Sequence, residues 1–111
     1  MRVLFDVDGT LIESGSGSDG GGRPKAAMVH LLTALAASGH LIYVASSGGR
    51  GYAVEQCMAL GIRDLVRIVE KEPDDYDLVI DDDPGVAQGL GRQLLHVRSG
   101  VLDADTDAPW L

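Results

Sequence analysis

The sequence VLFDVDGTL, residues 3–11, decides the fold. A short apolar run ends on two carboxylates at alternate positions, Asp6 and Asp8, and the chain then turns at Gly9. Alternate residues of a strand point to the same side, so both acids face the same way. Because the strand is apolar on both faces, we expect it in the centre of a parallel sheet. Both acids then lie at its carboxyl end, where open α/β sheets bind ligands.

This acid pair indicates a metal site. Two carboxylates held close together repel each other unless a cation lies between them, and oxygen ligands favour a hard ion such as Mg²⁺. One carboxylate can also attack a phosphorus atom while the other moves protons. Acid pairs at strand ends also occur in structural turns and at Ca²⁺ sites, so the downstream residues decide between these interpretations.

Apolar runs alternate with helical patterns along the rest of the chain. A helix is expected with Pro24 in its first turn and Gly39 as its stop, because the apolar residues from Met28 to Ala36 share one face. A strand, a helix of this length and a second strand form a right-handed βαβ unit, so the strands should be parallel. Further strands are expected at 41–45, 65–69, 78–80 and 94–97, a helix at 52–60, and a short helix after Pro84 that buries Val86, Ala87 and Leu90.

Serines and glycines follow the second strand. A hydroxyl there, with glycines that free backbone N–H groups, is suited to hold a phosphoryl oxygen. The plainer alternative is a serine N-cap with a tight glycine turn. Ser46 directly follows the strand and is the preferred residue, while Ser47, one place further on, stays open.

Charged residues follow the third and fourth strands. Lys71 either reaches the carboxylates or pairs with neighbouring acids in solvent, where an ion pair adds little stability. Asp81, Asp82 and Asp83 are costly to place together unless a cation compensates them. Asp83 is explained as a helix N-cap before Pro84, whereas Asp81 and Asp82 are not.

These residues, in this order, resemble the four motifs of the haloacid dehalogenase (HAD) superfamily of phosphohydrolases, and the resemblance covers about residues 2–98. It implies a three-layer α/β, Rossmann-like fold with a mainly parallel five-stranded sheet and helices on both faces. The matching residues are Asp6, Asp8, Gly9 and Thr10 for the first motif, Ser46 for the second, Lys71 for the third, and Asp81 and Asp82 for the fourth.

The resemblance implies a Mg²⁺-dependent phosphomonoesterase that works through an aspartyl phosphate. Asp6 would be the nucleophile and Asp8 the general acid and base, while Ser46 or Ser47 and Lys71 would bind the phosphate. The implied metal ligands are Asp6, the backbone carbonyl of Asp8, and the pair Asp81 and Asp82. By register Asp82 makes the closer contact and Asp81 supports it, with the reverse order also open.

Two segments lack the apolar pattern. Residues 12–23 are rich in glycine and serine and predict a flap loop beside the acidic strand end. HAD members carry one class of cap domain at this position, so the resemblance implies a single capless domain over residues 1–111. Residues 99–111 form an acidic C-terminal tail without periodicity.

The composition limits the binding partners and the cell compartment that we expect for this protein. A net charge of −8 disfavours general binding to nucleic acid or to an anionic membrane. Cys57 is the only cysteine, and no leader or membrane-spanning run occurs, so we expect a cytoplasmic protein. A capless site takes either a macromolecular phosphate or a small phosphorylated substrate enclosed by a neighbouring subunit of a homo-oligomer. A nucleic-acid end is not favoured by the charge.

Two other functions use similar residues. A receiver-type phosphoacceptor domain also combines Asp, Ser or Thr, Lys and Mg²⁺ on a parallel sheet, but receivers place the phosphoacceptor after the third strand and the lysine after the fifth. A catalytically silent HAD-like binding module is the other alternative, and the intact set of motif residues weighs against it.

Overall fold

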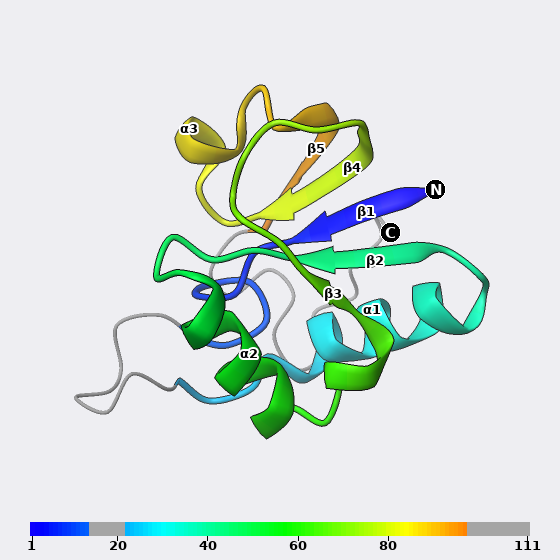
Figure 1. The fold of residues 1–111 in the computed structure, drawn as a ribbon, viewed down its shortest axis with the longest axis vertical. Helices are drawn as coiled ribbons and strands as arrows, with labels where there is room; N and C mark the ends of the chain where they lie inside the picture. The colour runs from blue at the N-terminus through cyan, green and yellow to red at the C-terminus, as the bar shows by residue number, and fades with distance from the viewer. Residues whose placement is uncertain (14–21, 98–111) are drawn as a thin grey trace.

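A computed structural model describes residues 1–13 and 22–97, which contain a five-stranded sheet (Figure 1). Every strand pairing in it is parallel, so the predicted parallel α/β, Rossmann-like fold is confirmed. The strands lie in the order β3-β2-β1-β4-β5, with β1 (Arg2–Phe5), β2 (Leu41–Val44), β3 (Arg67–Ile68), β4 (Tyr76–Asp81) and β5 (Gly91–His96).

The central strand β1 fixes which loops meet. Phe5 lies beside Val44 of β2 on one side and beside Ile80 of β4 on the other. The pairing with β4 continues one residue further, because the Asp6 N–H donates to the Ile80 carbonyl at 3.0 Å. The residues just past β1, β2 and β4 therefore emerge at the same edge of the sheet.

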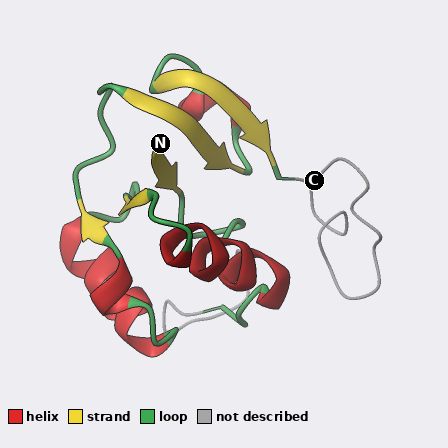
Figure 2. Ribbon diagram, turned by 90° about the vertical axis from the view of Figure 1, so that its right-hand side faces the viewer, coloured by secondary structure: helices red, strands yellow, loops and turns green. Residues whose placement is uncertain are grey.

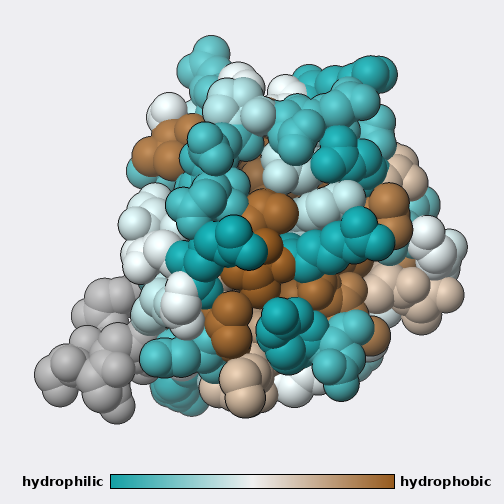
Figure 3. All heavy atoms as spheres, viewed as in Figure 1, coloured by the Kyte–Doolittle hydropathy of each residue, from teal (hydrophilic) through white to brown (hydrophobic). Residues whose placement is uncertain are grey.

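Helices cover the two faces of the sheet unequally (Figure 2). The helices α1 (Ala26–Ala37) and α2 (Arg50–Ala59) lie on one face, where Met28 and Cys57 pack with Val3 and Phe5 in the larger core cluster. The four-residue helix α3 (Pro84–Ala87) covers part of the other face, in the cluster that contains Leu4. In the view of Figure 1, apolar side chains gather over the middle of the sheet and hydrophilic ones surround them (Figure 3).

The chain reverses its direction across the sheet at β1. It moves outward through α1, β2, α2 and β3, and then returns to the other side of β1 for β4, α3 and β5. Right-handed crossovers in opposite directions put their helices on opposite faces, as observed. The loops after β1 and β4 part at this point, which is where open α/β sheets form a ligand-binding crevice.

Several predicted boundaries are wrong. Pro24 is not in the first turn of α1, because it pairs with Ile12 in an antiparallel bridge and Lys25 is the residue before the helix. Of the predicted strand 65–69 only residues 67 and 68 pair, because Arg63–Leu65 form a 3₁₀ turn. The predicted helix 52–60 begins two residues earlier, at Arg50, and β5 begins at Gly91 instead of at residue 94.

The base of the predicted flap loop is held together. The Glu13 N–H donates to the Arg23 carbonyl at 2.8 Å, and a Cβ on Gly22 would lie 1.9 Å from the Glu13 carbonyl oxygen. Residues 14–21 of the predicted loop and all of the predicted tail at 99–111 lie outside the described residues. Within the described ranges, no helix has both the length and the apolar character needed to cross a membrane.

Two methionines test the packing of the larger core cluster. Met28 in α1 is fully buried, whereas Met58 in α2 is 64% exposed. We expect Met28→Ala to lower the free energy of unfolding by about 2–5 kcal/mol, because it leaves a cavity. Met58→Ala, the matched control, should change it by less than about 0.5 kcal/mol. Urea unfolding of the two variants measures both values, and equal losses would contradict the orientation of these helices.

Candidate functional site

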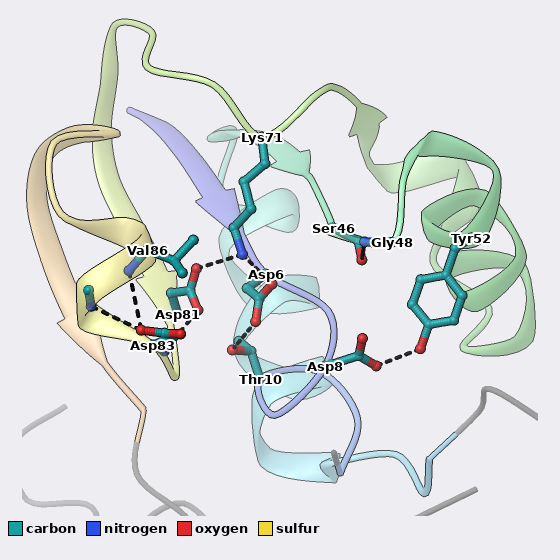
Figure 4. Close-up of polar contacts among 11 residues, drawn as sticks. Asp6, Asp8, Thr10, Ser46, Gly48, Tyr52, Lys71, Asp81, Asp83 and Val86 are labelled. Carbon is teal, nitrogen blue, oxygen red and sulfur yellow. Dashed lines mark hydrogen bonds and ion pairs between the residues drawn. The ribbon is translucent and has the colours of Figure 1, made fainter. Parts of the chain in front are cut away.

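The loops after four parallel strands bring charged and hydroxyl side chains to one edge of the sheet (Figure 4). Asp6 directly follows β1, and Asp81 is the last residue of β4. Lys71 lies in the loop after β3, and Ser46 follows β2. Their backbones are placed by strand pairing, so these side chains meet although they are far apart in the sequence.

Lys71 joins the acids of the first and fourth strands. Its ammonium lies 2.7 Å from Asp6 Oδ1 and 3.0 Å from Asp81 Oδ2. Burial lowers the pKa of Lys71, but the hydrogen bonds and charges of Asp6 and Asp81 outweigh it, so the net pKa is raised and the ammonium stays charged. The alternative in which Lys71 pairs with its sequence neighbours in solvent is therefore wrong.

Asp6 is fixed through both of its carboxylate oxygens. Oδ1 binds Lys71, and Oδ2 accepts a hydrogen bond from Thr10 Oγ1 at 3.2 Å. The side chain is buried, and burial raises the pKa of Asp6. The Lys71 ammonium opposes this rise, while the charge of Asp81 adds to it. The anionic form of Asp6 thus depends on positive charge in its surroundings.

Asp81 is fully buried and only partly satisfied. Its Oδ1 accepts the Asp83 backbone N–H at 3.0 Å. Its Oδ2 accepts no hydrogen bond within the described residues and has only the nearby Lys71 charge. This buried oxygen has the Lys71 ammonium as its only contact among these residues and keeps acceptor capacity, so it is a candidate metal ligand.

Asp82 completes the acidic cluster through close contact with the turn after β1. A Cβ on Gly9 would lie 2.1 Å from Asp82 Oδ2, and Gly9 has a φ of +80°. The position therefore requires glycine twice over, for its backbone conformation and for the space that the Asp82 carboxylate occupies.

One ligand atom from each of Asp6, Asp81 and Asp82 lies within 4.8 Å of the other two. When all three are ionised, the carboxylates carry more negative charge than the Lys71 ammonium balances, and the pKa of Asp6 is raised to about 8, chiefly by burial. Such a cluster must take up protons or bind a cation. Oxygen-only ligands and an excess of negative charge suit a hard divalent ion, so the three acids can hold a metal.

Asp8 lies apart from this cluster. Its carboxylate is exposed and turns toward α2, where the Tyr52 hydroxyl donates a hydrogen bond of 2.5 Å to Oδ1 (Figure 4). Burial and this hydrogen bond raise the pKa of Tyr52, so the phenol remains protonated. Of the predicted metal ligands, Asp8 thus contributes no side chain to the acidic cluster.

The two serines after β2 differ in exposure. Ser46 is buried, and its Oγ accepts the Gly48 N–H at 3.0 Å, whereas Ser47 is exposed. The serine N-cap interpretation is wrong, because Gly49 precedes α2 and no side chain caps that helix. By contrast, Asp83 does cap α3, since its Oδ1 accepts the backbone N–H groups of residues 85 and 86.

These groups share one pocket of about 210 Å³. Val86 is 46% exposed and forms part of the pocket wall, so its predicted burial in the helix after Pro84 is wrong, while Ala87 and Leu90 are buried. The lining residues are Asp6, Asp8, Ser46, Ser47, Lys71, Asp81, Asp82, Asp83 and Val86.

The sequence patterns missed the residues that support this pocket. Thr10 stands within the first motif, but its bond to Asp6 was not foreseen. Tyr52 belongs to an ordinary amphipathic helix pattern, and its contact with Asp8 spans 44 residues. The spacing of four residues between Asp6 and Thr10 could have indicated their contact. No feature of the sequence indicates the contact of Tyr52 with Asp8.

Comparison with protein-family models and with curated protein sequences finds no match to this chain. The fold and the acidic cluster therefore carry the functional argument.

Gly9 offers a test of the acidic cluster. We expect Gly9→Ala to displace the Asp82 carboxylate and to weaken divalent-metal binding by roughly 10- to 100-fold, the usual effect of disturbing the residues that orient metal ligands. Gly39→Ala is the control, because Gly39 also has a positive φ but nothing lies within 4 Å of its added Cβ. Calorimetric titration with Mg²⁺ or Mn²⁺ measures both, and equal affinities would contradict the role of Gly9.

Proposed function

We propose that this protein is a Mg²⁺-dependent phosphomonoesterase of the HAD type that works through an aspartyl phosphate. The observation that carries the proposal is the acidic cluster of Asp6, Asp81 and Asp82, whose residues share one pocket with Lys71 and Ser46. A phosphate monoester dianion needs positive charge on its oxygens and a nucleophile in line with the leaving group. Lys71 provides one positive charge and Asp6 a nucleophile, and a cation held by the acidic cluster would provide the remaining positive charge.

Asp6 is the proposed nucleophile. Lys71 and Thr10 hold its two oxygens, so the carboxylate is oriented before substrate arrives. Attack forms a bond from Asp6 to phosphorus as the bond to the leaving oxygen breaks. The Lys71 ammonium and the Ser46 hydroxyl line the same pocket and stabilise the charge on the phosphoryl oxygens.

Asp8 is the proposed general acid and base. Asp8 is one of the residues that line the pocket, and it is exposed, so its carboxylate can exchange protons with both a leaving group and water. As a carboxylic acid it gives a proton to the leaving oxygen. As a carboxylate it then takes a proton from the water that attacks the aspartyl phosphate and frees Asp6.

The donor set fits a hard divalent cation. Asp6 and Asp82 would hold it with the backbone carbonyl of Asp8, and Asp81 would support it through the Oδ2 that lacks a hydrogen bond. When bound, Mg²⁺ supplies charge neutralisation for the carboxylates and for the phosphoryl group.

The shape and charge around the pocket bear on the substrate. A second hollow of about 290 Å³ shares Ser46, Ser47, Lys71 and Val86 with the first, and it is lined further by Glu70 and Glu72. We propose a phosphorylated macromolecule, or a small phosphate ester enclosed by a neighbouring subunit in a homo-oligomer. The acidic rim disfavours a nucleic-acid end.

The receiver domain differs from the proposed enzyme in strand order, and the silent binding module differs from it in lacking catalytic turnover. Receiver domains have the strand order 2-1-3-4-5 with the phosphoacceptor after the third strand. Here the order is β3-β2-β1-β4-β5 and Asp6 follows the first strand. The silent binding module is separated by assay, since it would bind Mg²⁺ without hydrolysing an aryl phosphate.

Replacement of each acid in the loop after β1 by asparagine tests the mechanism. We expect Asp6→Asn to abolish hydrolysis of 4-nitrophenyl phosphate while the fold is retained, because an amide cannot form the aspartyl phosphate. Asp8→Asn should lower kcat by roughly 10²- to 10⁴-fold, the usual contribution of general acid and base catalysis. Asp75→Asn, an exposed acid paired with Arg92, is the control for both. Normal turnover of 4-nitrophenyl phosphate by Asp6→Asn would contradict the proposal.

Metal binding should stabilise the fold. Mg²⁺ at about 100 times its Kd should raise the free energy of unfolding by about 2.7 kcal/mol, because the unfolded chain has no such site. Asp82→Asn should lose most of this stabilisation and Asp75→Asn should keep it. Urea unfolding with Mg²⁺ or with EDTA measures the difference, and equal stabilisation of both variants would place the ion elsewhere.

A further inference from the structure

Tyr52 contacts the candidate site but has no part in the mechanism proposed above. It lies in the first turn of α2, and its hydroxyl donates to Asp8 Oδ1 (Figure 4). Its ring lies over Gly48, where an added Cβ would be 3.1 Å from Tyr52 Cδ2. The Gly48 N–H in turn binds Ser46 Oγ. One side chain thus touches both the loop after β1 and the loop after β2.

The position of Asp8 makes this contact important. An exposed aspartate next to a glycine turn has several accessible rotamers, and a proton can be transferred only from the one that faces the leaving oxygen. Asp8 lines the pocket, whereas Tyr52 does not. The phenol therefore contacts the Asp8 carboxylate without lining the pocket itself.

We propose that Tyr52 is a positioning residue, which holds the Asp8 carboxylate in the orientation for proton transfer to the leaving group. This inference rests on the proposed phosphomonoesterase function. The hydrogen bond occupies Oδ1, so the transferable proton of the carboxylic acid lies on Oδ2. As the phosphorus–oxygen bond breaks and the bond to Asp6 forms, Oδ2 gives this proton to the leaving oxygen. It later takes a proton from the attacking water.

A pair of substrates distinguishes positioning from a structural role. Phenyl phosphate has a basic leaving oxygen that needs protonation, whereas 4-nitrophenolate leaves well without it. We expect Tyr52→Phe, which keeps the ring on Gly48, to lower kcat/KM for phenyl phosphate about tenfold and kcat/KM for 4-nitrophenyl phosphate less than about threefold. The ratio kcat/KM reports only the steps up to departure of the leaving group, whereas hydrolysis of the aspartyl phosphate is common to both esters. Tyr76→Phe, a buried tyrosine outside the pocket, should leave the ratio of the two rates unchanged.

A double-mutant cycle identifies the residue through which Tyr52 acts. In an Asp8→Ala background, which lacks the acceptor, Tyr52→Phe should have no further effect on either rate. Equal losses for the two esters, or a loss that persists without Asp8, would overturn the inference and leave Tyr52 with a structural role.

The failure of the proposed function is recognised separately. If the wild-type protein hydrolyses neither ester, the phosphomonoesterase proposal fails, and with it any role of Tyr52 in the reaction. The contact itself is then tested by urea unfolding of the wild-type protein, Tyr52→Phe, Asp8→Ala and the double variant. Tyr52→Phe should lower the denaturation midpoint in the wild-type background and not in Asp8→Ala, and equal lowering in both would show that the hydrogen bond does not hold Asp8.

Discussion

The excess of negative charge beside Lys71 is the constraint on which this end of the molecule depends. Asp6 and Asp81 are buried, Asp82 lies beside them, and the Lys71 ammonium forms ion pairs with Asp6 and Asp81. A protein interior supports such an arrangement only when a proton or a cation makes up the difference. The strand order makes the arrangement unavoidable, because β1 and β4 are neighbours and run parallel. The acids at the ends of these strands must therefore meet. Because carboxylates placed together destabilise the fold, their presence at this edge indicates that they bind a ligand.

Much of this could be predicted from the sequence, because the fold is organised by strands that are apolar on both faces. Such strands are recognisable without a partner, and the first polar residue after each is then placed at one edge by parallel pairing alone. Asp6, Ser46 and Asp81 could be expected to converge on that basis, whereas Lys71, which follows Glu70, was indicated only by its order along the chain. The separate roles proposed for these residues, as metal ligand, nucleophile or supporting residue, could not be predicted. Those roles depend on the positions of individual side-chain atoms, which a sequence pattern does not give.

The errors have a common physical origin in tertiary contacts that override local preference. Pro24 suits a first helical turn, but its bridge to Ile12 keeps it extended. Val86 has the spacing of a buried residue, yet α3 is only four residues long and turns it toward the pocket. Tyr52 has the pattern of a helix surface, and only the placement of α2 beside the first loop gives its hydroxyl a partner. Each of these three residues lies in, or contacts, a loop or a short helix, where pairing between strands gives no guidance.

The site combines two environments that the proposed phosphoryl transfer requires separately. A nucleophilic carboxylate benefits from burial, because the surrounding dipoles and charges act more strongly where water is excluded. An acid and base that must exchange protons with water needs exposure. The turn at Gly9 permits both within three residues, since it leaves Asp6 beneath Lys71 and Thr10 while Asp8 turns outward to α2. An exposed carboxylate lacks the packing that orients a buried one, so a hydrogen bond from a neighbouring helix is the simplest way to orient it without enclosing it.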